Sequence, residues 1–334
     1  MKRSFGIIAF IVLAFSFLHS EVNAQQKSVV PLPPDLAGLP TIWAEPWLSI
    51  DADHLPSLEG GSFDRQGNLY VTHSLPPRTL LKVDAQKHVT TIFDAKDVDP
   101  NMGLNGTAIH KDGRIFVCTT TGELLSMNPD GSNVNIVKLA YKGKILVQND
   151  LLFDAKGNLF VTDFVGNMGD PSGGVYYVSA DGKSVQPVLT HLMSPNGVSL
   201  SPDGKTLWIA ETAGNALIRA DLLDDGVTLK GNQFVSYVYH ETGWNGMDSN
   251  RVDADGNVYQ AMHGQGRILV VNKLGIPIAN ILVRGRDEGR FLNTNNLAFK
   301  PGTKEGYIMA GGVGGAIIFK FEMLAPALPL FSHQ

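Results

Sequence analysis

A unit made of a polar turn and an apolar strand recurs along most of the chain, and this repeat narrows the possible folds more than any other property of the sequence. Each copy has a glycine in its turn, followed by a short run rich in β-branched and aromatic residues, which is typical of a strand entered from a tight turn. The turn glycines are Gly67, Gly113, Gly157, Gly204 and Gly256, with a weaker sixth copy around Gly302. A second apolar strand segment follows each first one, and no stretch has helical periodicity.

The turn glycines lie 44–52 residues apart, which is the size of one four-stranded propeller blade. A β-solenoid has shorter repeats, and a β-sandwich has no reason to repeat six times. We therefore predict an all-β fold, a six-bladed β-propeller over residues 41–334.

The composition is that of an ordinary globular protein. The chain has 334 residues, of which 43% are hydrophobic and 18% are charged. Its formal net charge is −5 and no basic block occurs, which argues against a nucleic-acid partner.

The N-terminus has the pattern of an export signal. Two basic residues precede an apolar run over residues 5–18, and Val22-Asn23-Ala24 is a plausible cleavage site. We predict a signal peptide over residues 1–24, a Pro-rich arm over 25–40, and a periplasmic or secreted protein without membrane contact after cleavage. An uncleaved anchor is the alternative. The single cysteine, Cys118, excludes an internal disulfide.

A polar residue stands eight positions before each turn glycine. These residues are Glu59, Asn105, Asn149, Asn196 and Asp248, and Asn295 and Asn296 lie near the sixth turn. Because the innermost strand of each blade lines the channel of a propeller, equivalent positions face one another across the axis. The repeat thus predicts a ring of side-chain oxygens in the channel.

Such a ring has the chemistry of a metal site. Glu59 and Asp248 would balance one divalent cation, and buried carboxylates are costly without a counter-charge. A set of carboxylate and amide oxygens without His or Cys favours Ca²⁺. The alternative is structural, because Asn-Gly pairs such as Asn105-Gly106 and Asn196-Gly197 are common in turns.

At these residues the sequence resembles the regucalcin/gluconolactonase family of six-bladed, calcium-dependent propellers. The resemblance lies in the segments LEGGSFD, QNDLLFD, SPNGVSLSPDGKTLWIAET and MDSNRVDADGNVY. Other segments, such as HGQGRILVVNKLGIPI and GRDEG, are similar to the bacterial drug-responsive lactonase branch.

The resemblance implies one catalytic Ca²⁺ and the residues that hold it. The implied ligands are Glu59, Asn149, Asn196, Asp248 and Ser249. It also implies that Asp248 transfers the proton in lactone hydrolysis. The segment 119–148 is shorter than in the lactonase branch and lacks an acidic cluster, which argues against that branch's second, structural calcium.

These features favour an exported calcium-dependent lactonase acting on a small-molecule substrate. Asp248 is the candidate base, and Asn105 and His263 are the candidate substrate-binding residues, His263 because its glycine-rich neighbours leave room for a ligand. Two alternatives stay open. One is a phosphotriester or ester hydrolase on the same site, and the other is a non-catalytic ligand-binding propeller with a structural ion. No Gly-x-Ser-x-Gly elbow, P-loop or HExxH motif occurs.

Overall fold

A computed structural model describes residues 28–51, 58–231, 237–240 and 246–334 of the chain. The predicted signal peptide, residues 1–24, lies outside the described residues, as does the start of the predicted arm. In the described part of the chain, no helix has both the length and the apolar character needed to cross a membrane.

Four sheets each contain four strands, and within each sheet every strand pairs antiparallel with the next. The first holds β2 (Leu58–Phe63), β3 (Leu69–His73), β4 (Thr79–Val83) and β5 (Val89–Asp94). The second holds β6 (Leu104–Ile109), β7 (Ile115–Thr119), β8 (Glu123–Met127) and β9 (Asn135–Lys138). The third holds β12 (Gln148–Phe153), β13 (Leu159–Asp163), β14 (Gly173–Val178) and β15 (Val185–Leu192). The fourth holds β16 (Pro195–Leu200), β17 (Thr206–Glu211), β18 (Ala216–Asp221) and β19 (Tyr237–His240).

The remaining long strands form one sheet of eight, in the order β20-β21-β22-β23-β1-β26-β25-β24. Their bounds are β1 (Thr41–Asp51), β20 (Met247–Val252), β21 (Val258–Met262), β22 (Arg267–Val271), β23 (Pro277–Val283), β24 (Asn293–Phe299), β25 (Glu305–Gly311) and β26 (Ala316–Glu322). The first part of β1 pairs parallel with β23, and the rest of it pairs antiparallel with β26.

The number of separate sheets differs from the prediction. The sequence predicted six blades, whereas the described strands form four separate four-stranded sheets and one sheet of eight. The cause is β1, which lies outside the repeat and uses both of its edges, so that it joins two groups of strands that the repeat counts separately.

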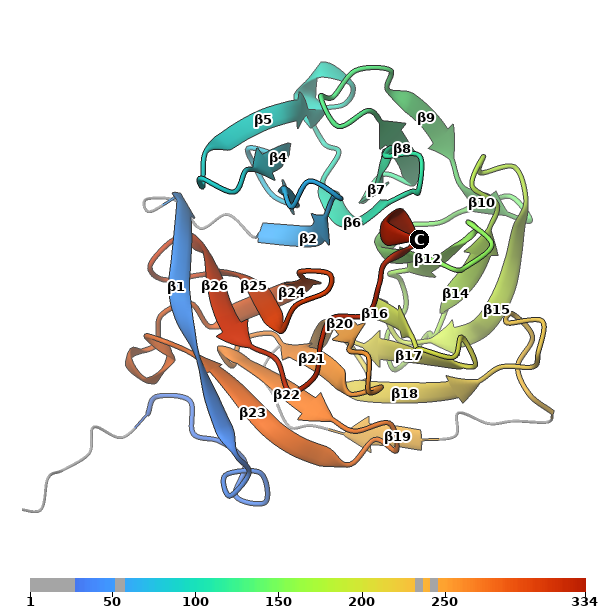
Figure 1. The fold of residues 1–334 in the computed structure, drawn as a ribbon. Coiled ribbons are helices and arrows are strands. Elements are labelled where there is room, and N and C mark those ends of the chain that lie inside the picture. Colours follow the sequence, from blue (N-terminus) through green and yellow to red (C-terminus); the bar gives the residue numbers. More distant parts are fainter. Residues whose placement is uncertain (1–27, 52–57, 232–236, 241–245) are drawn as a thin grey trace, which may run out of the picture.

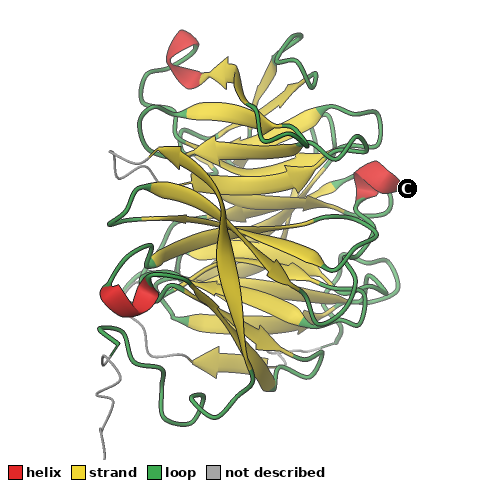
Figure 2. Ribbon diagram, turned by 60° about the vertical axis from the view of Figure 1, so that its left-hand side comes forward, coloured by secondary structure: helices red, strands yellow, loops and turns green. Residues whose placement is uncertain are grey.

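The sheets are arranged like the blades of a propeller (Figure 1). The strands nearest the centre are β2, β6, β12, β16, β20 and β24, and each contacts the next around a closed ring. The view turned by 60° shows the stacked strands from the side, with the C-terminus at one face of the molecule (Figure 2).

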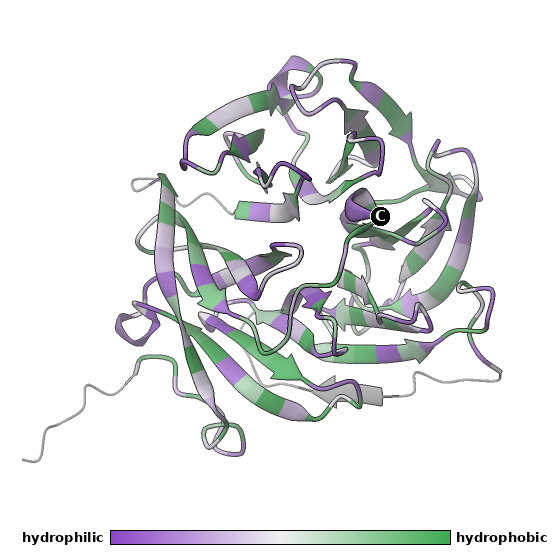
Figure 3. Cartoon of the chain, viewed as in Figure 1, coloured by the Kyte–Doolittle hydropathy of each residue, from purple (hydrophilic) through white to green (hydrophobic). Residues whose placement is uncertain are grey.

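Apolar side chains fill the space between neighbouring sheets. One core cluster joins Phe116 and Cys118 of the second sheet to Leu159 and Val161 of the third. Most strands therefore contain both polar and apolar residues, because only some side chains of each strand point into such an apolar layer (Figure 3). Cys118 is fully buried there, as expected for a small apolar residue.

The turns of the repeat share one backbone conformation and one set of side-chain contacts. The turn glycines Gly67, Gly113, Gly157, Gly204 and Gly256 all have left-handed φ values between 70° and 93°, which other residues rarely adopt. In the first turn the Asp64 side chain accepts the backbone N–H groups of Gln66 and Asn68 at 2.9 and 2.8 Å. Asp154 and Asp253 repeat this arrangement in later turns.

Short elements and both ends of the described chain complete the structure. The short elements are a β10 (Ala140–Tyr141) to β11 (Lys144–Ile145) hairpin and the 3₁₀ turns η1 (Ala95–Asp97), η2 (Arg286–Glu288) and η3 (Phe331–His333). The Pro-rich segment packs on the sheets, since Leu36 is buried in a cluster with Trp208 and its carbonyl accepts a bond from Asn280.

Candidate metal centre

The predicted ring residues occupy equivalent places in the central strands. Glu59, Asn105, Asn149, Asn196 and Asp248 are each the second residue of their strand, and Asn295 is the third residue of β24. All six are at least 92% buried, with exposed fractions of 0–8%. The six side chains thus stand at equivalent levels of the six central strands, and their role as a ring of metal ligands stays a prediction.

Each central strand has a register shift at this level. In β2 the shift falls between Glu59 and Ser62, and corresponding shifts occur in the other five central strands. Bulges of this kind bend a strand and redirect its side chains, and they are frequent next to active sites. The sequence analysis did not detect these bulges.

The glycines that follow ring residues allow neighbouring central strands to approach closely. A Cβ on Gly106 would lie 2.8 Å from the Asn149 carbonyl oxygen, and one on Gly197 would lie 2.5 Å from the Asn250 nitrogen. Both glycines lie within strands, β6 and β16. The alternative that these Asn-Gly pairs form turns is therefore wrong, since the glycines serve strand packing.

Glu59 and Asp248 are two buried carboxyl groups that repel one another. Burial raises the pKa of Glu59 well above its usual value, and the charges of Asp248 and Asp150 raise it further. Burial also raises the pKa of Asp248, against hydrogen bonds from His263, the Ser249 backbone and Asn196. Two carboxyl groups in such surroundings favour the approach of a cation, which would stabilise both in the ionised form.

Two oxygens of the ring lack a hydrogen-bond partner in the described part of the protein. They are Glu59 Oε2 and Asn196 Oδ1, and both are buried. A buried oxygen without a partner is rare, and a hard cation would satisfy both atoms at once. Among the described residues, no three His, Cys, Asp or Glu side chains cluster as a metal site, since the predicted set consists of two carboxylates with amide and hydroxyl oxygens.

Asn105 and Asn295 use their amides to connect neighbouring central strands. Asn105 Nδ2 donates to the Gln148 carbonyl at 2.9 Å, and Asn295 Nδ2 donates to the Leu58 carbonyl at 3.1 Å. In each case the acceptor immediately precedes a ring residue of the next strand. The substrate-binding role of Asn105 stays a prediction beside this structural contact.

His263 lies beside the predicted base. Its Nδ1 is 3.2 Å from Asp248 Oδ2 and 2.7 Å from Asn295 Oδ1. Burial lowers the pKa of His263, but the contacts with Asp248 and Asn295 together more than offset this, so the pKa is raised overall. His263 is thus placed at the ring by its contacts with two ring residues. Asn149 and Ser249 are placed there by their positions in β12 and β20.

A second buried polar layer lies one or more residues further along the same strands. It contains Asp150, Arg251 and Asn296, which come from β12, β20 and β24. Arg251 Nη1 is 2.9 Å from Asp150 Oδ2. Sequence reasoning named Asn296 but assigned no role to Asp150 or Arg251. A visible signal was that Asp150 and Asn296 stand where β2, β6 and β16 have a glycine.

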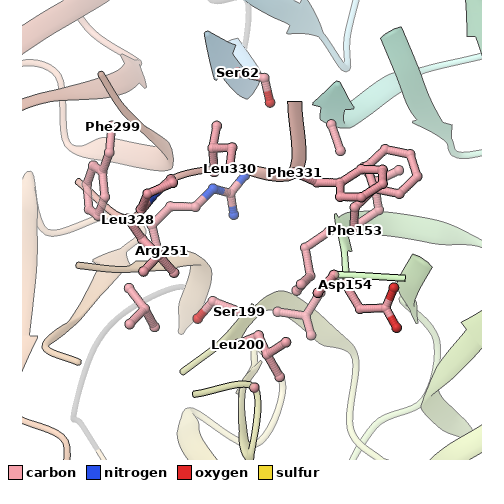
Figure 4. A pocket seen from close by; sticks show the side chains of 18 of the residues that line it. Ser62, Phe153, Asp154, Ser199, Leu200, Arg251, Phe299, Leu328, Leu330 and Phe331 are labelled. Atoms are coloured by element: carbon pink, nitrogen blue, oxygen red, sulfur yellow. The ribbon is translucent and has the colours of Figure 1, made fainter. Parts of the chain in front are cut away.

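A cavity of about 560 Å³ occupies the other end of the central strands. Figure 4 shows Arg251, Ser62 and Ser199 on its wall, facing Leu330 and Phe331 of the C-terminal segment. The ring of Phe331 packs against Phe153, with centroids 5.3 Å apart. The C-terminal segment therefore covers this end of the channel, opposite the predicted metal ligands.

Comparison with known sequences places the chain in one family. A family model described as the SMP-30/Gluconolactonase/LRE-like region matches residues 59–285. The protein named Lactonase drp35 from Staphylococcus saprophyticus is 42% identical over 309 residues, covering 90% of this chain and 93% of the relative. Lactonase drp35 from Staphylococcus haemolyticus is 40% identical over 320 residues, covering 92% of this chain and 95% of the relative.

Solved structures agree on the fold. A gluconolactonase from Xanthomonas campestris matches with a TM-score of 0.65 and 19% identity, covering 88% of this chain and 99% of that one. A calcium-binding regucalcin from Agrobacterium tumefaciens matches with a TM-score of 0.63 and 18% identity, covering 87% and 99%. The family resemblance drawn from the four ring segments is confirmed, and the chain belongs to the SMP-30/gluconolactonase/LRE-like family.

Proposed function

We propose that this protein is an exported, calcium-dependent lactonase whose site is the ring of buried oxygens in the channel. The observation that carries the proposal is the pair Glu59 and Asp248, two buried carboxyl groups in a ring where Glu59 Oε2 and the amide oxygen of Asn196 lack hydrogen-bond partners among the described residues. Relatives named as lactonases align over nine-tenths of the chain, which supports a lactone as the substrate.

We further propose that the eight-stranded sheet is two blades joined by β1. In this description β20 to β23 form one blade, and β24 to β26 with β1 form another. Together with the four separate sheets this gives six blades, and six central strands do contact one another in a ring. The ring then has one member per blade.

The residues proposed to hold Ca²⁺ are Glu59, Asn149, Asn196, Asp248 and Ser249. They supply the hard oxygen ligands that this ion prefers. When bound, the ion would supply a positive charge that polarises the carbonyl of a lactone. We propose one such ion and no second, structural one.

Asp248 is the proposed proton-transfer residue. It would accept a proton from the water that attacks the lactone carbonyl carbon. It would then return this proton to the ester oxygen of the lactone as the bond between that oxygen and the carbonyl carbon breaks. A carboxylate has two oxygens, so Asp248 could hold the ion with one oxygen and take the proton with the other. His263 Nδ1 is 3.2 Å from Asp248 Oδ2 and can hold that oxygen in place.

Substrate would contact Asn105 and His263, the two remaining polar side chains proposed to face it. The C-terminal segment covers the other end of the channel, so substrate would approach from the end at which the central strands begin. The substrate is a small molecule, and neither nucleic acid nor a membrane takes part.

The proposal is tested by hydrolysis of a lactone panel, including dihydrocoumarin and gluconolactone, with the chain lacking residues 1–24. Chelation should abolish hydrolysis and added Ca²⁺ should restore it. Ca²⁺ binding without turnover of any lactone would contradict the lactonase. Turnover of phosphotriesters would then support the ester hydrolase, and no turnover at all would support the ligand-binding propeller.

The role of Asp248 is tested with Asp248→Asn, which keeps an oxygen ligand but removes the base. We expect the turnover of this variant to fall about 10²–10⁴-fold. The variant should still bind Ca²⁺, although more weakly than the wild type. Asp253→Asn is the matched control, because Asp253 is buried in the turn of the same hairpin and its carboxylate accepts bonds from that turn and from Tyr259, none of them a ring residue. Full activity in Asp248→Asn would show that another group moves the proton.

Export is tested separately, by locating the protein in cell fractions and determining its mature N-terminus. Cleavage after Ala24 and recovery from the periplasm or the medium would support the proposal. A chain that keeps residues 1–24 and stays with the membrane would instead be anchored.

A further inference from the structure

The polar layer beneath the ring is built around the amide of Asn296. Asn296 and Asp150 are fully buried, and the Arg251 side chain is 16% exposed. These three residues come from three different central strands, so the layer connects parts of the chain that are far apart in sequence. None of the three belongs to the proposed ligand set.

The orientation of the Asn296 amide is fixed by two donors. Its Oδ1 accepts a hydrogen bond from Arg251 Nη2 at 3.2 Å and another from the Leu297 backbone N–H at 2.8 Å. A flipped amide would direct its own NH₂ group at both donors. The Nδ2 group must therefore point away from Arg251, toward the ring.

The Arg251 guanidinium is itself held in place. Nη1 donates to Asp150 Oδ2 at 2.9 Å and to the Asn250 carbonyl at 2.7 Å. Asp150 has no exposed side-chain surface, so its carboxylate is shielded from water and the geometry of the pair is restricted. A fixed planar guanidinium is well suited to set the direction of a neighbouring amide.

Asn296 reaches two of the proposed calcium ligands. Its Nδ2 donates to Ser249 Oγ at 2.8 Å, and its side chain also lies beside the Glu59 carboxylate, whose pKa it lowers. One amide from β24 therefore contacts a ligand from β20 and another from β2. Bonds of this kind orient ligand oxygens before a metal arrives.

We propose that Asn296 is a positioning residue, held in one orientation by Arg251, which sets the affinity for Ca²⁺ by orienting Ser249 and Glu59. This inference rests on the proposed calcium ring. It assigns to the layer a role in metal binding, beyond the satisfaction of buried polar groups.

The test is calorimetric titration of the protein with CaCl₂ after removal of metal by chelation. In Asn296→Leu, which keeps the branched shape of the side chain and removes the amide, we expect Ca²⁺ binding about 10–100-fold weaker. In a Ser249→Ala background the same substitution should cost clearly less than in the wild type, because one of its two targets is gone. Asn296→Leu and Ser249→Ala are therefore expected to be non-additive.

Two further variants separate positioning from loss of stability. Asn280→Leu is the matched control, since Asn280 is also fully buried, bonds the Leu36 carbonyl and lies in β23 away from the ring. It should lose stability in urea without a change in Ca²⁺ affinity. The double variant Asp150→Leu/Arg251→Met removes both charges together and should weaken Ca²⁺ binding about as much as Asn296→Leu.

The outcomes distinguish this inference from the function on which it rests. If the wild type does not bind Ca²⁺, the ring and the positioning role both fall. If the wild type binds and Asn296→Leu binds equally well, only the positioning role is overturned. Equal weakening by Asn296→Leu and Asn280→Leu would likewise overturn it, because the effect would then follow stability.

Discussion

Among single residues, His73 gives the stability of this protein a pH dependence. It ends β3, its Nδ1 lies 2.9 Å from Thr79 Oγ1, and its Nε2 is buried without a hydrogen-bond partner among the described residues. Burial lowers the pKa of His73 to about 4, although the charge of Asp51 opposes this. The native state therefore binds this proton less readily than the unfolded chain, whose histidines titrate near ~6.5.

We predict that the free energy of unfolding falls as the pH drops from about 6.5 to about 4, because the unfolded state then takes up the proton first. The loss from His73 should be on the order of 3 kcal/mol. Urea unfolding at several pH values measures it. His73→Gln should flatten the dependence, while His88→Gln, at an exposed side chain, should not. Equal slopes in wild type and His73→Gln would contradict the prediction.

The ring residues were predictable one by one, but their contacts were not. The repeat alone predicted the level of Glu59, Asn196 and Asp248, because every central strand starts in the same way. Arg251 was not identified, and Asn296 was named without its contacts, since the importance of both depends on which strands meet across the channel. A sequence carries no direct record of such contacts at separations of 45 or 101 residues.

Between secondary-structure elements, the close contact of β16 and β20 depends on a single glycine. A Cβ on Gly197 would lie 2.5 Å from Asn250 N and 2.6 Å from Ser249 Cα. Backbone atoms cannot move aside as a flexible side chain can, so the two strands would have to separate. Because Asn196 and Ser249 lie at this contact, the separation would also disturb the ring.

Gly197→Ala should therefore destabilise the protein by about 1–3 kcal/mol and weaken Ca²⁺ binding. Urea unfolding and calcium titration measure the two effects. Gly38→Ala is the control, because no atom lies within 4 Å of the added carbon, and its stability should stay within about 0.5 kcal/mol of wild type. Wild-type stability in Gly197→Ala would show that the strands can adjust.

The strands themselves were largely predictable, and β1 shows where prediction ended. Turn glycines and alternating apolar runs located most strands, because those signals are local. The segment 41–51 was assigned to the propeller without a pairing partner. Its parallel pairing with β23 and antiparallel pairing with β26 join residues more than 230 positions apart, and no local pattern specifies such pairs.

At the level of the whole molecule, the ring gathers side chains from sheets that also meet through apolar layers and individual hydrogen bonds such as Ser62 Oγ to the Thr107 carbonyl. The proposed ligands come from β2, β12, β16 and β20, which belong to four different sheets. An ion held by all of them binds only when these sheets are assembled around the axis. Ca²⁺ binding and folding of all these sheets should therefore be thermodynamically linked.

This linkage predicts a shift of the whole unfolding transition. At a free Ca²⁺ concentration of 100 times Kd, the gain in unfolding free energy should be about 2.7 kcal/mol, and calorimetric melting should show one transition that moves as a unit. Glu59→Gln keeps the size of its side chain but removes half of the ring's carboxylate charge, so its calcium-induced shift should be much smaller. A split transition, in which only some sheets respond to Ca²⁺, would mean that the ion is held within one blade and that the ring does not unite the molecule.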